Sequence, residues 1–226
     1  MQTKFGAIIV DGSGKIGGHV ATKNRNGNAL RTKIKPSNKN STDQQEIRSI
    51  FAQVAKKWLS LSPEQVQAWN AAAENASYSN SFGDKKKLTG RALFQQVNSN
   101  LLIGNFTMRE DPPSDGDIIE TEDDYWEDYF DQLKYHSIST LPTTGCLVIE
   151  ATKPLRNGQS NLTGKFRIIG VIAGNNQNEF DYTTLYTNKF GTPVVGQRIV
   201  VRVFTINSAN GKRSQLVVHD FVVQDH

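Results

Sequence analysis

The sequence predicts a multidomain α+β protein, and three observations lead to this class. Residues 1–41 are basic and rich in Gly and Asn, which favours turns and short strands over helices. Apolar residues recur with a helical period within 42–104, and the pattern changes to short β-branched and aromatic runs within 141–226. An acidic stretch with adjacent prolines, 105–140, separates the two patterns, and we expect it to be a linker.

The basic N-terminal arm is predicted to be a β-ribbon. Ile16–Thr22 and Asn28–Ile34 flank the dipeptide Asn26-Gly27, and both residue types tolerate the positive φ angles that a tight hairpin turn needs. The arm has too few large apolar side chains to bury a core of its own. We therefore expect it to lie against another domain or another subunit.

Residues 42–104 are predicted to form a small three-helix unit. Its first helix carries an apolar stripe, because the apolar residues are placed at helical spacing. They are Ile47, Ile50, Phe51, Val54 and Trp58. We expect Phe51 and Trp58, together with Trp69 of the second helix, to form the core of a helical hairpin.

The boundaries of the next two helices follow from capping signals. Ser62–Gln65 provides a Ser N-cap, a Pro at the first helical position and a Gln that closes a capping box. Ser77–Lys87 is expected to be a polar loop. Thr89 can cap a third helix, which is expected to end near Gly104.

Residues 141–226 are predicted to form an antiparallel β-sandwich of the immunoglobulin or fibronectin type III kind. Turn residues separate its expected strands, and Asn210-Gly211 is expected to join the last two. The strands are Cys146–Thr152, Lys165–Ile172, Phe180–Tyr186, Arg198–Ile206 and Ser214–Val223. Within the preceding linker, Glu122–Lys134 is expected to form a short acidic helix.

Charge is unevenly distributed along the chain. The formal net charge is +4, but residues 1–40 carry +7 and residues 105–135 carry −9. A basic segment and an acidic segment in one chain indicate either charged partners, including copies of the same chain, or simply solvated loops. Block charges alone leave these alternatives open.

Composition excludes several classes of protein. No apolar stretch approaches the ~18 residues that a membrane helix needs. No signal peptide is expected, because the apolar run Ala7–Val10 ends at Asp11. The single cysteine, Cys146, excludes an internal disulfide and a Cys-rich zinc site, and we expect it to be a buried structural thiol.

No catalytic, cofactor-binding or metal site is expected. Gly12–Gly17 matches G-x-G-x-x-G, but turn residues follow where a dinucleotide-binding fold needs a helix. The histidines lack partners at metal-binding helical spacing and are expected on the surface. They are His19, His136, His219 and His226. The acidic residues of the linker lack the rigid support that paired catalytic carboxylates need, so we expect the protein not to be an enzyme.

A DNA-binding function is the alternative. Trp58–Glu64, followed by Trp69, is similar to the last helices of an HMG box, which bends DNA by inserting apolar side chains into the minor groove. Arg48 and Lys56-Lys57 would then contact phosphates. The plainer interpretation is a helical hairpin whose two Trp residues pack on each other. It is favoured, because aromatic residues at helical spacing usually belong to a core.

An ordered series of motifs runs from the arm to the third predicted helix. They are Phe5-Gly6, Gly14–Gly18, Lys23–Asn28, Leu30-Arg31, Lys35–Asn38, Gln45, Arg48, Phe51, Trp58, Leu61, Trp69, Ala71–Ala73, Phe82-Gly83, Leu88–Gly90 and Leu93-Phe94. In this series residues 5–104 resemble a family of structural proteins of tailed bacteriophages, including crAss-like phages. Ala29 departs from the family where an aromatic residue often stands, and residues 105–226 carry no matching motif.

The resemblance implies a virion structural protein, first of all an auxiliary or minor capsid protein, with the head-tail connector or the tail as other positions. It implies many copies in an assembly that forms in the host cytoplasm, with major capsid or connector subunits as partners and neither a membrane nor a cofactor. The cations of the arm would pair with acidic residues of a partner or with packaged DNA. They are Lys15, Arg25, Arg31, Lys33 and Lys35.

Overall fold

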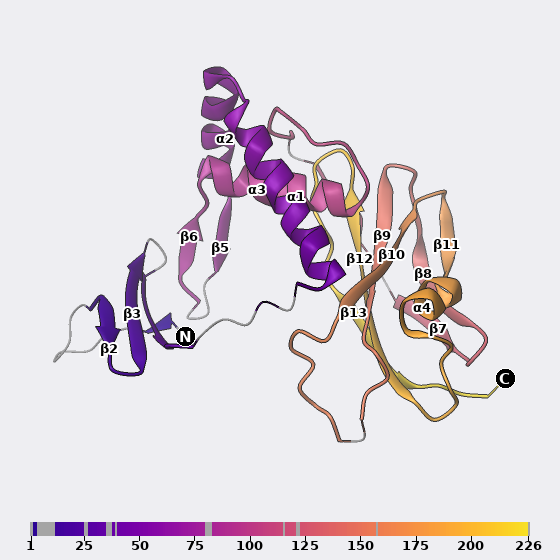
Figure 1. The fold of residues 1–226 in the computed structure, drawn as a ribbon. Coiled ribbons are helices and arrows are strands. Elements are labelled where there is room, and N and C mark those ends of the chain that lie inside the picture. The colour runs from indigo at the N-terminus through magenta and orange to yellow at the C-terminus, as the bar shows by residue number, and fades with distance from the viewer. Residues whose placement is uncertain are drawn as a thin grey trace.

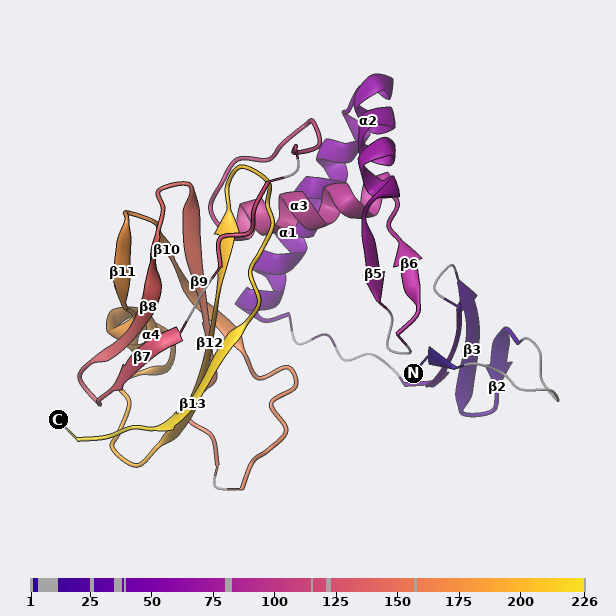
Figure 2. The same ribbon diagram turned by 180° about the vertical axis from the view of Figure 1, so that it is seen from behind.

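The computed structural model has the mixed α+β architecture that the sequence predicts (Figure 1). The described part of the chain is 2–3, 12–24, 27–34, 38, 40–79, 83–114, 116–120, 123–156 and 158–225. Its helices are α1 (Thr42–Leu59), α2 (Pro63–Glu74), α3 (Gly90–Ile103) and α4 (Thr183–Phe190). Figures 1 and 2 show the helical unit between a small N-terminal sheet and a larger C-terminal β-domain.

The N-terminal sheet is antiparallel, with the strand order β1-β4-β3-β2. Its strands are β1 (Gln2–Thr3), β2 (Gly14–Ile16), β3 (His19–Asn24) and β4 (Gly27–Thr32). β3 and β4 correspond to the two predicted strands of the ribbon. The expected Asn26-Gly27 turn is not supported at Gly27, which has a φ of 105° but is the first residue of β4 and lies opposite Asn24 in the ladder. Asn26 lies outside the described residues.

The helical unit agrees with the capping signals in the sequence. The Ser62 side chain accepts a hydrogen bond from the Gln65 backbone, and the Gln65 side chain accepts one from the Ser62 backbone, so the capping box is complete. The Thr89 side chain accepts a bond from the Ala92 N–H at the start of α3. The buried core of the unit is formed by Val54, Trp69, Phe94, Val97 and Leu101.

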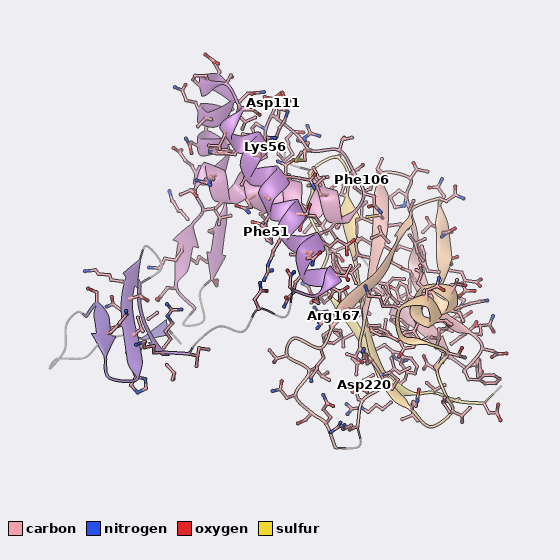
Figure 3. The ribbon with its side chains drawn as sticks, in the orientation of Figure 1. Phe51, Lys56, Phe106, Asp111, Arg167 and Asp220 are labelled. Carbon is pink, nitrogen blue, oxygen red and sulfur yellow. The ribbon has the colours of Figure 1, made fainter. Side chains whose placement is uncertain are left out.

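Two predictions for the helical unit are wrong. Phe51 is not a core residue: its side chain is 47% exposed on the surface of α1, because α3 covers a narrower face of α1 than the apolar stripe suggests (Figure 3). Ser77–Lys87 is not a simple loop, since it contains β5 (Ser77–Ser79) and β6 (Lys85–Lys87). These two strands pair through backbone hydrogen bonds, which form whether the side chains are polar or apolar.

The C-terminal domain consists of two antiparallel sheets that share one core. One sheet has the order β10-β9-β12-β13 and the other β11-β8-β7. The strands are β7 (Asp123–Asp128), β8 (Leu133–Leu141), β9 (Gly145–Ala151), β10 (Arg167–Ala173), β11 (Gln177–Asp181), β12 (Arg198–Asn207) and β13 (Val217–Val222). Large side chains from both sheets meet between them, among them Tyr135, Ile149, Phe180 and Val201.

The predicted acidic helix at Glu122–Lys134 is wrong, and much of the expected linker is a β-hairpin. β7 and β8 pair over this segment, so the acidic stretch contributes two strands of the second sheet. Partners from elsewhere in the fold offset the charge of β7. Glu127 contacts Lys134 and His136, and Asp128 contacts His219.

The other C-terminal error concerns the predicted strand Phe180–Tyr186. The strand β11 ends at Asp181, and α4 begins at Thr183. The Asp181 carboxylate accepts a hydrogen bond from the Thr183 N–H at 2.9 Å, which satisfies one of the free donors at a helix start. This local bond favours the helix over a continued strand.

In the described part of the chain, none of the helices combines the length and the apolar character that a membrane crossing requires.

Candidate docking surface

The basic face of the N-terminal sheet follows from strand register. Lys15 lies opposite Val20 in the β2–β3 ladder, and Val20 lies opposite Arg31 in the β3–β4 ladder. Residues that are directly opposite in a ladder project from the same face of a sheet. The two predicted contact cations therefore flank a half-buried valine across three strands, and both are exposed.

The opposite face of this sheet provides little core. Gly14, Ala21 and Leu30 stand in one row across the ladder. Ala21 is the one fully buried residue among those whose burial is described between 12 and 34, and Leu30 is half-buried. The sheet therefore depends mainly on its backbone hydrogen bonds, and its surface is open on the basic face.

Lys33 is the third predicted contact cation that the structure describes. It follows β4, its side chain is exposed, and its N–H donates to the Gly18 carbonyl at 2.7 Å. Ile34 is 76% exposed beside it. The last two predicted contact cations, Arg25 and Lys35, lie outside the described residues.

A second basic element, the β5–β6 hairpin, was not predicted from the sequence. Lys85 and Lys87 are exposed and Lys86 is half-buried. Both views show this hairpin extending from the helical unit toward the N-terminal sheet (Figures 1 and 2). The three consecutive lysines were visible in the sequence, but no periodicity distinguished their strand from a loop.

A closely packed contact joins α3 of the helical unit to the β12–β13 loop of the C-terminal domain. Asn100 of α3 donates to the Gly211 carbonyl at 2.9 Å, and Arg109 donates to the Ala209 carbonyl at 2.8 Å. Gly211 has a φ of +64°, and a Cβ there would lie 2.8 Å from the Val97 carbonyl oxygen. Only glycine permits this approach of the β12–β13 loop to α3.

Two further contacts connect the same parts. Phe106, just after α3, packs against the helical core and also against buried residues of β9 and β12 (Figure 3). At the start of α1, the Asp43 carboxylate lies 3.1 Å from Arg167 and 2.6 Å from Lys189. Three separate places thus join the helices to the β-domain.

The two predicted tryptophans of the hairpin core both pack on Phe94. The ring centroids of Trp58 and Trp69 lie 5.2 and 5.1 Å from that of Phe94, each in an edge-to-face arrangement. The Trp69 Nε1–H donates to the Glu110 carbonyl. Trp69 is fully buried and Trp58 partly buried, so α3 supplies the aromatic contact that we expected the two tryptophans to make with each other.

The histidine prediction is wrong for His136, which is only 7% exposed. Its Nε2 lies 3.1 Å from Glu127 Oε1, and its ring stacks on Tyr125. His219 makes a similar contact, 2.8 Å from Asp128 Oδ2, and stacks on Trp126. A sequence separation of 91 residues between the members of the second pair hides it from pattern analysis.

Cys146 is a buried thiol, as expected. It is 1% exposed, and burial raises its pKa to about 12. Among the described residues, no group of three or more His, Cys, Asp or Glu residues is arranged to hold a metal ion.

A cleft of about 480 Å³ lies between the start of α1 and β9–β10. Charged side chains line it, and three of them, Asp43, Glu150 and Arg167, are paired within the fold. Asp43 contacts Arg167, and Glu150 contacts Arg202, whose guanidinium also stacks over Phe166. The Asp43–Arg167 pair connects α1 to β10 across the cleft, whereas the Glu150–Arg202 pair lies within one sheet.

Comparisons with known proteins identify no family for the chain. No family profile and no curated protein sequence matches it. One similar solved structure is that of T.fusca AA10A, with 12% identity and a TM-score of 0.27. The match covers 57% of this chain and 64% of that chain. A likeness of this size carries no argument about function.

Proposed function

We propose that this protein is a structural component of an assembled particle and that it docks on neighbouring subunits through its basic N-terminal sheet. The proposal extends the resemblance of residues 5–104 to tailed-bacteriophage structural proteins to a role as an auxiliary or minor capsid protein. A position at the head-tail connector or in the tail fits the same chemistry. The virion is then its location, and capsid or connector subunits are its partners.

One observation carries the proposal: the basic face of the N-terminal sheet belongs to neither of the large cores of the molecule. Lys15 and Arg31 are exposed on either side of Val20, and Ala21 alone is fully buried in this part of the described chain. An apolar centre between two cations suits a partner surface that has an apolar spot beside acidic side chains.

The C-terminal domain is proposed to be an immunoglobulin-like sandwich that projects from the particle or bridges its subunits. Its support is the strand order, with β11-β8-β7 facing β10-β9-β12-β13 across one core. Antiparallel sheets of three and four strands around a shared core are typical of this architecture. The fold alone names no partner for the domain.

DNA binding is the second candidate, and the β5–β6 hairpin is the feature that favours it. Lys85–Lys87 add three positive charges on the side of the helical unit that extends toward the basic sheet. The HMG-like use of the helical hairpin has less support, because Trp58 and Trp69 are occupied by contacts with Phe94.

Charge reversal on the sheet tests the proposed docking. The double variant Lys15→Glu, Arg31→Glu is expected to reduce the number of copies per purified particle about tenfold, the equivalent of roughly 1.4 kcal/mol. The matched control is Lys153→Glu, Arg156→Glu, which reverses two exposed cations of the C-terminal domain. Unchanged incorporation of the first variant contradicts the proposal.

A salt titration separates the two candidates. Binding of duplex DNA is expected to weaken steeply with salt, with a slope set by the number of phosphates that the protein neutralises. If substitution of Lys85–Lys87 by Gln abolishes steep, salt-dependent DNA binding and leaves particle attachment intact, the hairpin binds DNA and the sheet binds protein. If DNA binding is absent in the unmodified chain, the second candidate fails.

A further inference from the structure

The β13 strand is a sheet edge whose outward backbone groups can be assigned. It is the last strand in the order β10-β9-β12-β13. Val223, just beyond it, donates its N–H to Gln197 and accepts at its carbonyl from Gly196, so both of its backbone groups face β12. Because direction alternates along a strand, the backbone groups of Val218, Asp220 and Val222 face away from β12.

The end of this edge is already covered, which confirms the assigned direction. Gln224 donates to the Asp128 carbonyl at 2.9 Å and accepts from the Phe130 N–H at 3.1 Å. Both bonds lie on the side away from β12, as the alternation requires. Residues 128–130 thus cap the edge at Gln224, and the stretch from Val218 to Val222 stays uncapped within the described chain.

The side chains on the solvent-exposed face of β13 form a palindrome, because their order, Val-Asp-Val, is the same in both directions along the strand. Val218 is 55% exposed and Val222 is 51% exposed, and Asp220 lies midway between them. An exposed edge strand with apolar residues is a ready partner for another strand. The intervening residues, His219 and Phe221, instead pack inward, against Trp126 and the core of the domain.

The centre of the palindrome carries a matched charge pair. The Arg198 guanidinium makes a bidentate contact with the Asp220 carboxylate, with Nε donating to Oδ1 at 2.8 Å. Arg198 lies opposite Val222 on β12, so the pair is on the same solvent-exposed face as the two valines. Arg198 of β12 therefore neutralises the one anion in the middle of the exposed strand within the same chain.

We propose that β13 pairs antiparallel with β13 of a second copy of this chain, about a two-fold axis at Asp220. In this register, Val218 of each copy lies opposite Val222 of the other, and the outward backbone groups of 218, 220 and 222 form the new ladder. The two Asp220 carboxylates lie opposite each other at the axis, and each is neutralised by Arg198 of its own copy. The two four-stranded sheets become one sheet of eight strands.

A second copy fits this edge better than an unrelated strand does, because the exposed Val218 and Val222 are placed symmetrically about Asp220. A two-fold axis pairs a surface with the same surface, and only a palindromic strand then matches apolar to apolar at both ends. This contact is separate from the docking proposed for the N-terminal sheet and extends the function beyond it.

Sedimentation equilibrium of the full chain tests the contact. The unmodified chain is expected to dimerise, and the variant Val218→Lys, Val222→Lys is expected to be monomeric over the same concentration range. Ile138→Lys is the matched control, because Ile138 is 61% exposed on a strand of the other sheet. A monomeric unmodified chain overturns the proposal, and so does a dimer that the two lysines leave unchanged.

A cysteine at the axis tests the register. Opposed residues of a hydrogen-bonded antiparallel pair have Cα atoms about 5.5 Å apart, within the range of a disulfide. The variant Asp220→Cys is expected to form a cross-linked dimer on mild oxidation, whereas Ile138→Cys is not. Cys146 is buried and does not contribute. A dimer that survives in solution but does not cross-link through position 220 contradicts this register.

The two proposals fail independently. The variant Lys15→Glu, Arg31→Glu is expected to dimerise normally, while the β13 lysine variant keeps the basic face of its N-terminal sheet. If the sheet variant also loses dimerisation, the contact between copies belongs to the arm, and the β13 proposal is wrong.

Discussion

The N-terminal sheet and the C-terminal domain are both antiparallel β-structures, but they differ in what stabilises them. In the N-terminal sheet, Ala21 is the one fully buried residue among those with described burial, and the strands are two to six residues long. In the C-terminal domain, residues such as Tyr135, Ile149 and Val201 are fully buried between two sheets. Hydrogen-bonded strands therefore do not make a stable domain without buried apolar side chains.

The helical unit belongs with the C-terminal domain in this comparison. It has its own aromatic core around Phe94, and it contacts the β-domain at the Gly211 loop and at Asp43. We therefore expect helices and C-terminal sheets to unfold together, and the N-terminal sheet to contribute little to their stability. Substitutions in the helical core, at the contact between helices and sheets, and in the C-terminal sheets can test that division.

Truncation of a buried aromatic residue should have the largest effect. Trp69→Ala removes a fully buried side chain, together with its contact to Phe94 and its hydrogen bond to Glu110. We expect the free energy of unfolding, measured with denaturant, to fall by about 3–5 kcal/mol. Phe51→Ala is the control on an exposed position and should cost no more than about 1 kcal/mol. Equal losses would mean that Phe51 belongs to the core after all.

The contact between the helices and the β-domain is tested at Gly211. Gly211→Ala adds a Cβ that meets the Val97 carbonyl at 2.8 Å in a left-handed backbone conformation, and we expect it to cost about 1–3 kcal/mol. Gly158 also has a positive φ, 76°, but a Cβ there meets no atom within 4 Å. Gly158→Ala therefore measures the backbone strain alone. If both variants lose the same stability, close packing at Gly211 is not important.

Alkaline pH should weaken the C-terminal domain through Cys146. Burial raises the pKa of this thiol to about 12, so above about pH 9 the thiol of the unfolded chain ionises while the folded one stays protonated. Stability should then fall as pH rises from about 9 to 12. The denaturation midpoint of Cys146→Ala should decline less between about pH 8 and pH 11 than that of the unmodified chain. Parallel declines would show that the thiol is not linked to folding.

The smallest effects are expected from two buried tyrosine hydroxyls. The Tyr186 hydroxyl donates to the Thr152 carbonyl at 3.3 Å, whereas that of Tyr182 has no hydrogen-bond partner within the described part of the chain. Tyr186→Phe should lose about 1 kcal/mol, and Tyr182→Phe should lose nothing or gain slightly. Thermal denaturation of the two variants compares them directly. A larger loss at Tyr182 would reveal a partner for its hydroxyl.

Local signals in the sequence predicted the helical unit well, because its determinants are close together in the chain. The capping box at Ser62–Gln65 and the cap at Thr89 each involve residues three positions apart. The β-branched runs of β9 and β12 were equally visible, since both strands are buried almost throughout. For these elements, local pattern and tertiary packing agree.

The failures have a common physical cause, which is that distant partners decide the outcome. From the sequence alone, the acidic residues of β7 indicate a solvated segment. Their partners, among them Lys134 and His219, are brought beside them only by the fold. The exposure of Phe51 depends on which face of α1 is covered by α3. The candidate docking residues were predicted from charge alone, and their common face became visible only through the register of β2, β3 and β4.

Native-state hydrogen exchange of the full chain measures whether the N-terminal sheet lacks a core that could hold it folded. The amides of β3 and β4 are predicted to exchange through openings that cost far less free energy than those of β9 and β12, which should exchange only on global unfolding. Equal protection of the two sets of amides in the free, monomeric chain would contradict the claim, because the sheet would then be part of the same cooperative unit.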